Sequence, residues 1–260
     1  MNVLLIDIGN TRIKWASFDG QRLARQHAAV HSGWSGEDFA RRVIGSARSL
    51  DRILVASVAG SLVDRSLALA AGRARVAAPE FVASQRRAGG VTVGYVEPWR
   101  LGVDRFVATI GAHQLSKGRA VCVVGVGTAM TIDLVGADGR HQGGAIIPSP
   151  SLMVDTLLSN TNGIRRRAQG GSGGGTSLFG RSTRAAIVQG SRYAAAALID
   201  RAVGEARALV PGRAPLVMLT GGGAPAIQPL VQSTCVSVPD LVLKGLAVLC
   251  EEPKHPARAR

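Results

Sequence analysis

The chain carries one short pattern twice: an apolar strand that runs into a small turn containing Gly and Thr. Val3 to Ile6 leads into D-I-G-N-T at Asp7 to Thr11, and Ala120 to Val124 leads into G-V-G-T-A at Gly125 to Ala129. An unbroken apolar run is typical of a strand buried on both faces. The repeat predicts a duplicated α/β lobe with its seam near residue 116, and a chance echo of two short turns is the alternative.

The remainder of the chain predicts alternating strands and helices, which is typical of an α/β fold. The expected helices are Trp34–Arg48, Leu62–Ala71, one starting at Val103, Thr183–Leu209 and Leu241–Cys250. The expected extended segments are Ile13–Phe18, Arg52–Ser57, Val76–Ala83, Thr131–Val135, Gly144–Ile147 and Leu216–Leu219. We expect an N-terminal lobe at 1–116, a C-terminal lobe at 117–250 and a disordered basic tail at 251–260, with a flexible Gly/Ser-rich loop at 169–177.

Composition indicates a globular protein, since 46% of the residues are hydrophobic and 18% are charged. The net charge of +14 would suit an acidic partner, but the arginines are scattered, which favours a solvated surface over a nucleic-acid site. Three widely spaced cysteines form no metal motif and indicate a reducing, cytoplasmic location. No signal peptide and no apolar run of membrane-spanning length occur, so we expect no membrane association.

The first turn has the residue types that phosphate groups require. Gly9 allows close backbone approach, and the turn amides with the Thr11 hydroxyl can hold phosphate oxygens. Asp7 can hold Mg²⁺ through water, and Lys14 can reach a phosphate. An ordinary hairpin turn with a capping aspartate is the alternative.

Two further turns offer similar chemistry. Gly127, Thr128 and Thr131 repeat the glycine and hydroxyls after a buried strand, and Gly221 to Gly223 could lie against an adenine or a ribose. A plain loop is the alternative for each. The sequence contains neither a P-loop motif nor a G-x-G-x-x-G motif, and its five histidines, in no metal-binding pattern, are expected to be surface or packing residues.

A third candidate segment precedes the helix expected from Val103. Gly102 comes before an acid and a base, Asp104 and Arg105. Asp104 could accept a hydroxyl proton while Arg105 binds an anion. The alternative is an aspartate that stabilises a helix N-terminus through the helix dipole.

In this order the segments resemble those of type III pantothenate kinases and the related Bvg accessory factor proteins. The matching motifs are D-I-G-N-T at Asp7, Y-x-x-P-x-x-L-G-x-D-R at Tyr95, G-T-A-x-T-x-D at Gly127, G-G-A-I-I-P at Gly143, S-T-R-x-A-I at Ser182, T-G-G-G at Thr220 and D-L-V-L-K-G-L at Asp240. They span nearly the whole chain. The resemblance implies two actin- or ribonuclease H-like lobes of the ASKHA superfamily with an interlobe nucleotide cleft. It also implies ATP-dependent phosphorylation of pantothenate, the first step of coenzyme A biosynthesis.

The resemblance also implies roles for particular residues, with Asp104 as the general base. Pantothenate would be held by Tyr95, Gly102, Val103, Asp104, Arg105 and Thr183, the last across a homodimer interface. ATP would be held by Asp7, Ile8, Gly9, Asn10, Thr11, Arg12, Ile13, Lys14 and Thr128. Mg²⁺ is implied by the phosphates of ATP.

The sequence departs from the family pattern at the second turn. Gly125 stands where the family has an aspartate associated with a monovalent cation, K⁺ or NH₄⁺, which leaves Asp133 and water as nearby oxygen ligands. Ser149 replaces a common glycine, and the Gly-rich stretch before Ser182 is expanded. Two alternatives to the pantothenate kinase therefore stay open: a catalytically impaired regulator and a related kinase for another hydroxyl compound. ATP turnover tests the first, and competition by pantothenate tests the second.

Overall fold

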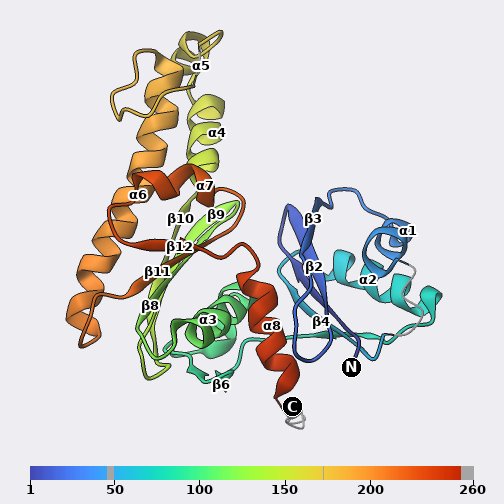
Figure 1. Cartoon of the computed structure of the whole chain (residues 1–260). Helices are drawn as coiled ribbons and strands as arrows, with labels where there is room; N and C mark the ends of the chain where they lie inside the picture. The colour runs from blue at the N-terminus through green and yellow to red at the C-terminus, as the bar shows by residue number, and fades with distance from the viewer. Residues whose placement is uncertain (46–49, 172, 253–260) are drawn as a thin grey trace. The chain divides into compact units, whose positions relative to one another are not determined.

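A computed structural model describes residues 1–45, 50–171 and 173–252. The chain forms two compact units (Figure 1). Unit 1 contains Met1–Leu115 and the segment that starts at Asp240, and unit 2 contains Ser116–Pro239. The expected seam near residue 116 lies at this boundary. The last helix, which we expected in the second lobe, packs with unit 1 instead.

Unit 1 is built on a five-stranded sheet in the order β3-β2-β1-β4-β5. The first strand is antiparallel to β2 and parallel to β4, which is parallel to β5. The strands are β1 (Val3–Ile8), β2 (Arg12–Phe18), β3 (His27–Val30), β4 (Arg52–Ser57) and β5 (Pro79–Phe81). All of β1 is buried, as its apolar run predicts.

Unit 2 repeats this arrangement in the order β10-β9-β8-β11-β12. Its first strand is again antiparallel to the next and parallel to the fourth, which is parallel to the fifth. The strands are β8 (Val121–Val126), β9 (Ala129–Val135), β10 (His141–Pro148), β11 (Leu216–Thr220) and β12 (Cys235–Ser237). The same order and the same strand directions in both sheets confirm the predicted duplication.

The helices of unit 1 cover both faces of its sheet. Leu4, Ile6 and Ile8 of β1 form a core with Phe39 and Leu67 from α1 (Gly36–Phe39) and α2 (Ser61–Ala74). Alternate residues of a strand point to opposite faces, so Asp7 lies on the other side of the sheet. α8 (Leu241–Glu251) packs on β1 and β4.

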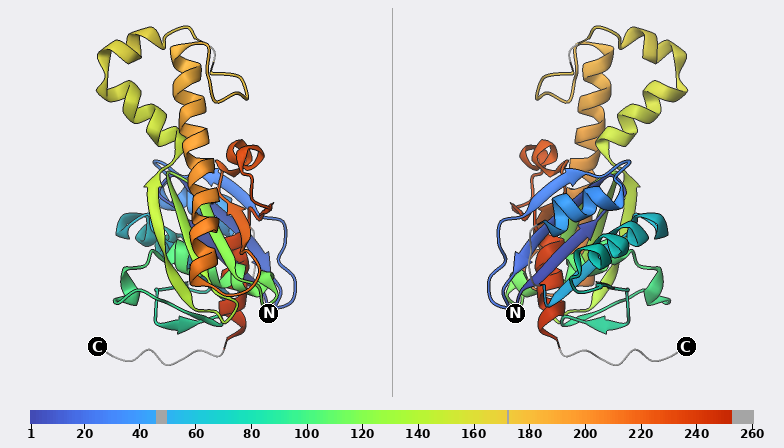
Figure 2. Two further views of the ribbon diagram at one scale, coloured as in Figure 1. Left: turned by 90° about the vertical axis from the view of Figure 1, so that its left-hand side faces the viewer. Right: turned by 90° about the vertical axis from the view of Figure 1, so that its right-hand side faces the viewer.

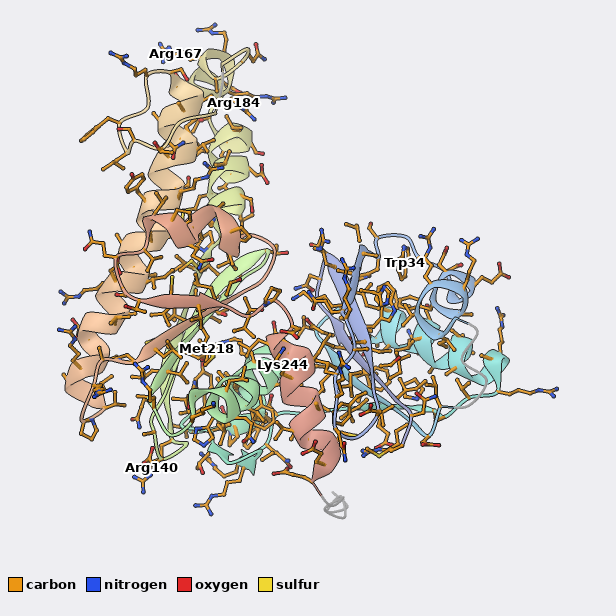
Figure 3. All side chains as sticks on the ribbon, viewed as in Figure 1. Trp34, Arg140, Arg167, Arg184, Met218 and Lys244 are labelled. Atoms are coloured by element: carbon orange, nitrogen blue, oxygen red, sulfur yellow. The ribbon has the colours of Figure 1, made fainter. Side chains whose placement is uncertain are left out.

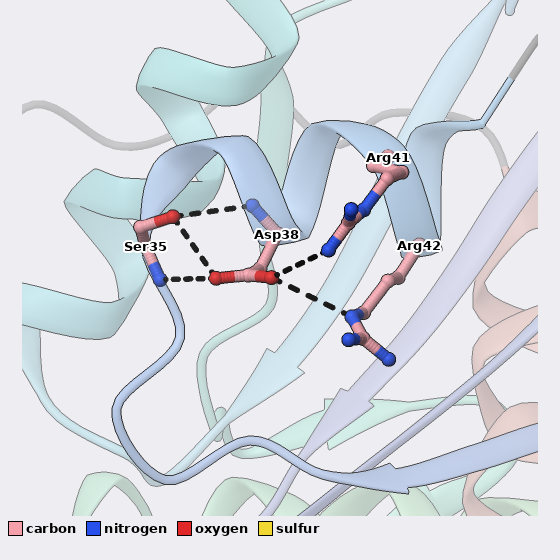
Figure 4. A network of polar contacts seen from close by, with 4 residues as sticks. All are labelled: Ser35, Asp38, Arg41 and Arg42. Atoms are coloured by element: carbon pink, nitrogen blue, oxygen red, sulfur yellow. Dashed lines mark hydrogen bonds and ion pairs between the residues drawn. The ribbon is translucent and has the colours of Figure 1, made fainter.

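The helix expected at Trp34–Arg48 begins with a capping box. The Ser35 hydroxyl accepts a hydrogen bond from the Asp38 amide, and the Asp38 carboxylate accepts one from the Ser35 amide (Figure 4). Arg41 and Arg42 pair with the same carboxylate. The chain continues as a π-helical turn, η1 (Ala40–Ile44), before Gly45 with φ 61°. The rest of the expected helix, at 46–49, lies outside the described residues.

The position of α8 follows from a close helix crossing within unit 1. α3 (Val103–Ser116) contains Gly111, and a Cβ there would lie 2.6 Å from the carbonyl oxygen of Leu241. A Cβ on Gly245 would collide with the carbonyl of Val107. The two glycines let the backbones of α3 and α8 meet. The described part of α8 extends to Glu251, one residue into the expected tail, and the tail from residue 253 lies outside the description.

Unit 2 has an arm that extends beyond its sheet (Figures 1 and 2). It contains α4 (Pro150–Asn160), α5 (Asn162–Arg167) and the first part of α6 (Thr183–Leu209), which has the predicted bounds. Arg167 and Arg184 lie near its tip (Figure 3). The rest of α6 packs Ala195, Ile199 and Val203 into the core of unit 2.

The remaining elements are short. They are the strands β6 (Arg87–Ala88) and β7 (Val91–Thr92), the 3₁₀ turns η2 (Pro98–Arg100) and η3 (Gln228–Leu230), and α7 (Ala224–Ile227). No helix in the described ranges is long and apolar enough to cross a bilayer.

Candidate active site

The first turn joins β1 to β2 and is closed by a hydrogen bond from the Gly9 amide to the Arg12 carbonyl, 2.9 Å. A Cβ on Gly9 would lie 3.2 Å from that oxygen, so glycine suits the tight backbone. Asn10, Thr11 and Arg12 are exposed, whereas Ile8 and Ile13 on either side are buried. The turn therefore presents Asn10, Thr11 and Arg12 at the surface of unit 1.

Asp7 and Lys14 lie opposite each other in the β1–β2 ladder. Their Oδ2 and Nζ atoms are 3.6 Å apart. The pKa of Asp7 is raised to about 6, chiefly by burial, and this net value includes a lowering by the Lys14 ammonium and a smaller raising by the carboxylate of Asp104. The structure thus brings Asp7, Lys14 and Asp104 into electrostatic contact, although Asp104 is distant in sequence.

The loop that carries Tyr95 is held to the start of α3 by Arg105. This buried guanidinium donates from Nη1 to the Tyr95 hydroxyl at 3.2 Å, and its carbon lies 5.8 Å from the centre of the Tyr95 ring. The Arg105 amide donates to Oδ1 of the half-buried Asp104, 2.9 Å away. Asp104 is therefore bonded to the backbone of the first helical turn, as the helix-dipole alternative also requires.

Gly102 has a steric reason to be glycine. A Cβ there would lie 2.8 Å from Oδ1 of Asp104, which is closer than real Cβ contacts allow. The Gly102 carbonyl accepts the Phe106 amide at 2.9 Å and so starts α3. The turn before the helix therefore leaves room for the Asp104 carboxylate, with Val103 half-buried between them.

In unit 2 the second and third turns meet backbone to backbone. The Gly127 amide donates to the Ala129 carbonyl at 2.9 Å, and Thr128 is exposed. The Gly223 amide donates to the Val126 carbonyl at 3.1 Å. Gly221 has φ 93°, and a side chain there would collide with Val126. These glycines thus permit a contact between the two turns, which the sequence did not predict.

The carboxylate considered as a substitute cation ligand lies in the core. Asp133 is 1% exposed, and its Oδ1 accepts from Nε2 of buried His141 at 2.9 Å. At Gly125 a Cβ would lie 2.9 Å from the Thr131 hydroxyl oxygen, so that hydroxyl occupies the space where a larger side chain would begin. Within the described ranges no three His, Cys, Asp or Glu side chains gather as a metal site.

Mg²⁺ and a monovalent cation fit these residues differently. Mg²⁺ commonly binds through one or two carboxylates together with substrate phosphates, and Asp7 beside the first turn supplies such an oxygen ligand. Gly125 supplies no side-chain oxygen for K⁺ or NH₄⁺. The donor set therefore fits Mg²⁺ and lacks the carboxylate of the family's cation position.

Thr183 lies apart from the second and third turns, in the arm. It is the first residue of α6, is half-buried and follows the N-cap Ser182, whose hydroxyl accepts from the Ala185 amide at 3.1 Å. Thr183 and Thr128 are therefore carried by different parts of unit 2.

Two residues beside the site were missed by the sequence analysis. His31, expected as a surface or packing residue, is buried and donates from Nε2 to the Gly9 carbonyl at 2.7 Å. Arg86 donates to the carbonyls of Val93 at 2.9 Å and of Tyr95 and Val96 at 2.8 Å each. Both residues act on backbone carbonyls, which carry no residue-type pattern in the sequence.

Comparison with known proteins finds relatives over most of the chain. A family model for type III pantothenate kinase matches residues 3–205. A type III pantothenate kinase of Nitrosococcus oceani is 36% identical over 258 residues, covering 96% of this chain and 94% of the relative. Another, from Herminiimonas arsenicoxydans, is 39% identical over 251 residues, covering 94% and 95%.

Solved structures show the same fold at low identity. A chain from Campylobacter jejuni described as a candidate Baf family transcriptional activator has a TM-score of 0.60 at 18% identity, covering 95% of this chain and 97% of the other. A candidate 2-dehydro-3-deoxygalactonokinase from Sinorhizobium meliloti has a TM-score of 0.58 at 15% identity, covering 95% and 98%.

The duplicated sheets and these structures show the fold class, an actin-like fold of two duplicated α/β lobes. Within that class, the family model and the two bacterial relatives decide the family. The chain belongs to the type III pantothenate kinase family.

Proposed function

We propose that this protein transfers the γ-phosphoryl group of ATP to the 4′-hydroxyl of pantothenate, forming 4′-phosphopantothenate in the first step of coenzyme A biosynthesis. The observation that carries the proposal is the grouping of Asp104, Arg105 and Tyr95 with the Asp7–Lys14 pair in one unit. A phosphate turn, a carboxylate at a helix start and a buried cation are the parts that a small-molecule kinase requires. Family membership supports pantothenate as the acceptor.

Asp104 is the proposed general base. Its half-buried carboxylate accepts the hydroxyl proton as the pantothenate oxygen forms a bond to the γ-phosphorus. The bond from that phosphorus to the β,γ-bridging oxygen breaks, and ADP leaves. In such reactions positioning and charge stabilisation supply most of the rate. The Asp104 hydrogen bond to the Arg105 amide fixes the carboxylate at the start of α3.

Pantothenate is the proposed ligand of the segment around Tyr95 and Gly102 to Arg105. Arg105 places a permanent positive charge in a buried position, which suits the carboxylate of pantothenate. Its hydrogen bond to Tyr95 holds the aromatic ring in place. We propose that Thr183 contributes a further substrate contact from the partner subunit of a homodimer.

ATP is the proposed ligand of Asp7 to Lys14 and of Thr128. The exposed residues Asn10 and Thr11 carry backbone amides and a hydroxyl that suit phosphate oxygens, and Lys14 adds a positive charge. Mg²⁺, when bound with the nucleotide, would neutralise phosphate charge, and Asp7 would hold it through water. One protein of this fold, the activator of 2-hydroxyisocaproyl-CoA dehydratase from Clostridium difficile, was solved with ADPNP bound, at a TM-score of 0.51 and 11% identity, which supports a nucleotide site.

The arm is the proposed homodimer interface. α4 has no buried side chain, although Leu152, Val154 and Leu157 make it apolar. Phe179 in the same arm is 83% exposed. Exposed apolar groups on an extended element are typical of an association surface.

We also propose a cytoplasmic location and turnover that does not depend on K⁺ or NH₄⁺. Cys122, Cys235 and Cys250 are free thiols, which suits a reducing compartment. Gly125 removes the carboxylate on which the family's cation site depends.

Product analysis tests the proposal. Purified protein with Mg²⁺ and ATP is supplied with pantothenate or a panel of sugars, in buffers containing K⁺, NH₄⁺ or Na⁺ alone, and products are identified by mass spectrometry. We expect 4′-phosphopantothenate at similar rates in all three salts. A phosphorylated sugar in its place would reassign the substrate, and ATP binding without any product would contradict the kinase assignment.

A further inference from the structure

A buried histidine is hydrogen bonded to the backbone of the first turn. His31 follows β3, is 5% exposed and donates from Nε2 to the Gly9 carbonyl oxygen at 2.7 Å. Its backbone amide donates to the Thr11 carbonyl at 3.3 Å. A single residue directly after β3 therefore donates hydrogen bonds to two carbonyls of the turn. It has no role in the proposed reaction.

The bond to Gly9 sets the direction of the next amide. In a trans peptide the C=O and N–H bonds point in opposite directions, and the described chain contains no cis peptide. With the Gly9 carbonyl turned towards His31, the Asn10 amide points away from it. Asn10 is exposed, and the Gly9 amide is already used in the bond to Arg12.

Glycine makes such a restraint necessary. The orientation of the Gly9–Asn10 peptide depends on the backbone torsion of Gly9, and glycine tolerates more torsion angles than any other residue. Without a fixed acceptor direction this peptide plane can rotate. Donors stabilise phosphate charge best when they are oriented before the ligand binds, because no reorganisation is then required.

We propose that His31 is a positioning residue for nucleotide phosphate binding, which orients the Asn10 amide through its hydrogen bond to the Gly9 carbonyl. The inference rests on the ATP site of the proposed function. It predicts a selective effect on ATP, because the pantothenate segment around Tyr95 belongs to other elements.

The test is ATP–Mg binding by titration calorimetry without pantothenate, for wild type and four variants. His31→Leu keeps bulk without a donor. His31→Gln places an amide at a reach similar to Nε2, and His31→Asn carries the same amide on a shorter side chain. The matched control is His27→Leu on β3, since His27 is exposed and stacks on Trp15 with ring centres 5.5 Å apart.

We expect His31→Leu to weaken ATP binding about tenfold, the size of one lost hydrogen bond. His31→Gln should stay within about threefold of wild type, and His31→Asn should be weaker than His31→Gln, since only the longer amide reaches the Gly9 carbonyl. His27→Leu should bind ATP as wild type does, and KM for pantothenate should stay within about twofold in every variant. If His31→Leu fails to fold in a thermal melt, the comparison of His31→Gln with His31→Asn decides.

The inference would be overturned if His31→Leu bound ATP as tightly as wild type, or if His31→Gln and His31→Asn bound ATP equally tightly. A variant that lost affinity for ATP and for pantothenate to the same extent would also overturn it. A different result would contradict the proposed function. If wild type binds ATP in this His31-dependent manner but does not phosphorylate pantothenate, the role of His31 stands and the proposed substrate is wrong.

Discussion

At the scale of single residues, the site contains groups whose placement costs stability. Asp7 is a carboxylate on a fully buried strand, held beside Lys14 and within the electrostatic reach of Asp104. Burial disfavours its charged form, whereas the proposed binding of Mg²⁺ requires that form. The residue is therefore expected to be retained for function at the expense of folding.

Asp7→Asn should stabilise the protein at neutral and basic pH. The pKa of Asp7 is raised from 3.8 to about 6, so the folded state binds the proton more tightly than the unfolded state. The stability linked to this group is fully present below pH 3.8 and is lost as the pH rises through 6. At pH 8 the variant should gain about 3 kcal/mol in the free energy of unfolding, and near pH 4 the gain should disappear. Urea denaturation across this pH range measures the difference.

Asp19→Asn provides the control of opposite sign. Hydrogen bonds from the Arg22 and Gln21 amides lower the pKa of the exposed Asp19, so its ionised form favours the folded state above the unfolded pKa. Asp19→Asn should therefore gain no stability at pH 8. A lower stability of Asp7→Asn than of wild type at pH 8 would contradict this description of Asp7.

At the scale of elements, Arg86 holds the loop that carries Tyr95 by hydrogen bonds to the backbone of that loop. Its three hydrogen bonds to the carbonyls of Val93, Tyr95 and Val96 should fix the loop that carries Tyr95. Arg86→Gln is expected to raise KM for pantothenate about five- to tenfold and to leave KM for ATP unchanged.

Arg87→Gln, at the exposed next residue on β6, removes the same charge and should change neither constant. Steady-state kinetics with each substrate varied in turn makes the comparison. If both variants raise KM for pantothenate equally, charge and not loop positioning is responsible.

The crossing of α3 and α8 predicts a second effect of an element on stability. Gly245→Ala places a methyl group against the Val107 carbonyl and should lower the free energy of unfolding by more than about 2 kcal/mol. Gly72→Ala in α2 meets no atom within 4 Å and should raise it by about 0.5–1 kcal/mol, because alanine favours helix. Thermal melts of both variants test the crossing, and equal melting temperatures would argue against it.

Elements with strong apolar patterns were predicted well from the sequence. The buried runs of β1 and β8 and the long α6 were located, and the repeat of turns identified the duplication. β3 was missed because three of its four residues are exposed, and α5 because half of its residues are arginines. α4 was missed although it is apolar. The last helix was assigned to the wrong unit because an amphipathic pattern shows which face of a helix is buried but not which strands or helices that face packs against.

The candidate site was only partly predictable for a similar reason. Asp7, Lys14, Asp104 and Arg105 have residue types that announce their chemistry, and they group within unit 1. His31 and Arg86 bind carbonyl oxygens, which every residue possesses. The contact of the third turn with Val126 likewise depends on two backbones lying close together. The sequence therefore showed the glycines of that turn but not that they contact Val126.

At the scale of the whole molecule, the arm predicts self-association. Leu157→Lys with Phe179→Ser should shift the proposed dimer towards monomers in sedimentation analysis, because the double substitution places charge and polarity on the exposed apolar face. Leu209→Lys changes an exposed leucine at the far end of α6 and should leave the assembly unchanged. A monomeric wild type, or an unchanged dimer in the double variant, would argue against the arm as the interface.

Asp104 is the proposed base of the phosphoryl transfer, and single-turnover kinetics of Asp104→Asn measures this role. Asparagine keeps the shape and an acceptor for the Arg105 amide but does not take the hydroxyl proton. We predict that the rate of phosphopantothenate formation falls at least about a hundredfold, a typical loss for general-base removal, while ATP and pantothenate still bind. An Asp104→Asn protein that phosphorylates pantothenate at the wild-type rate would show that Asp104 is not the general base.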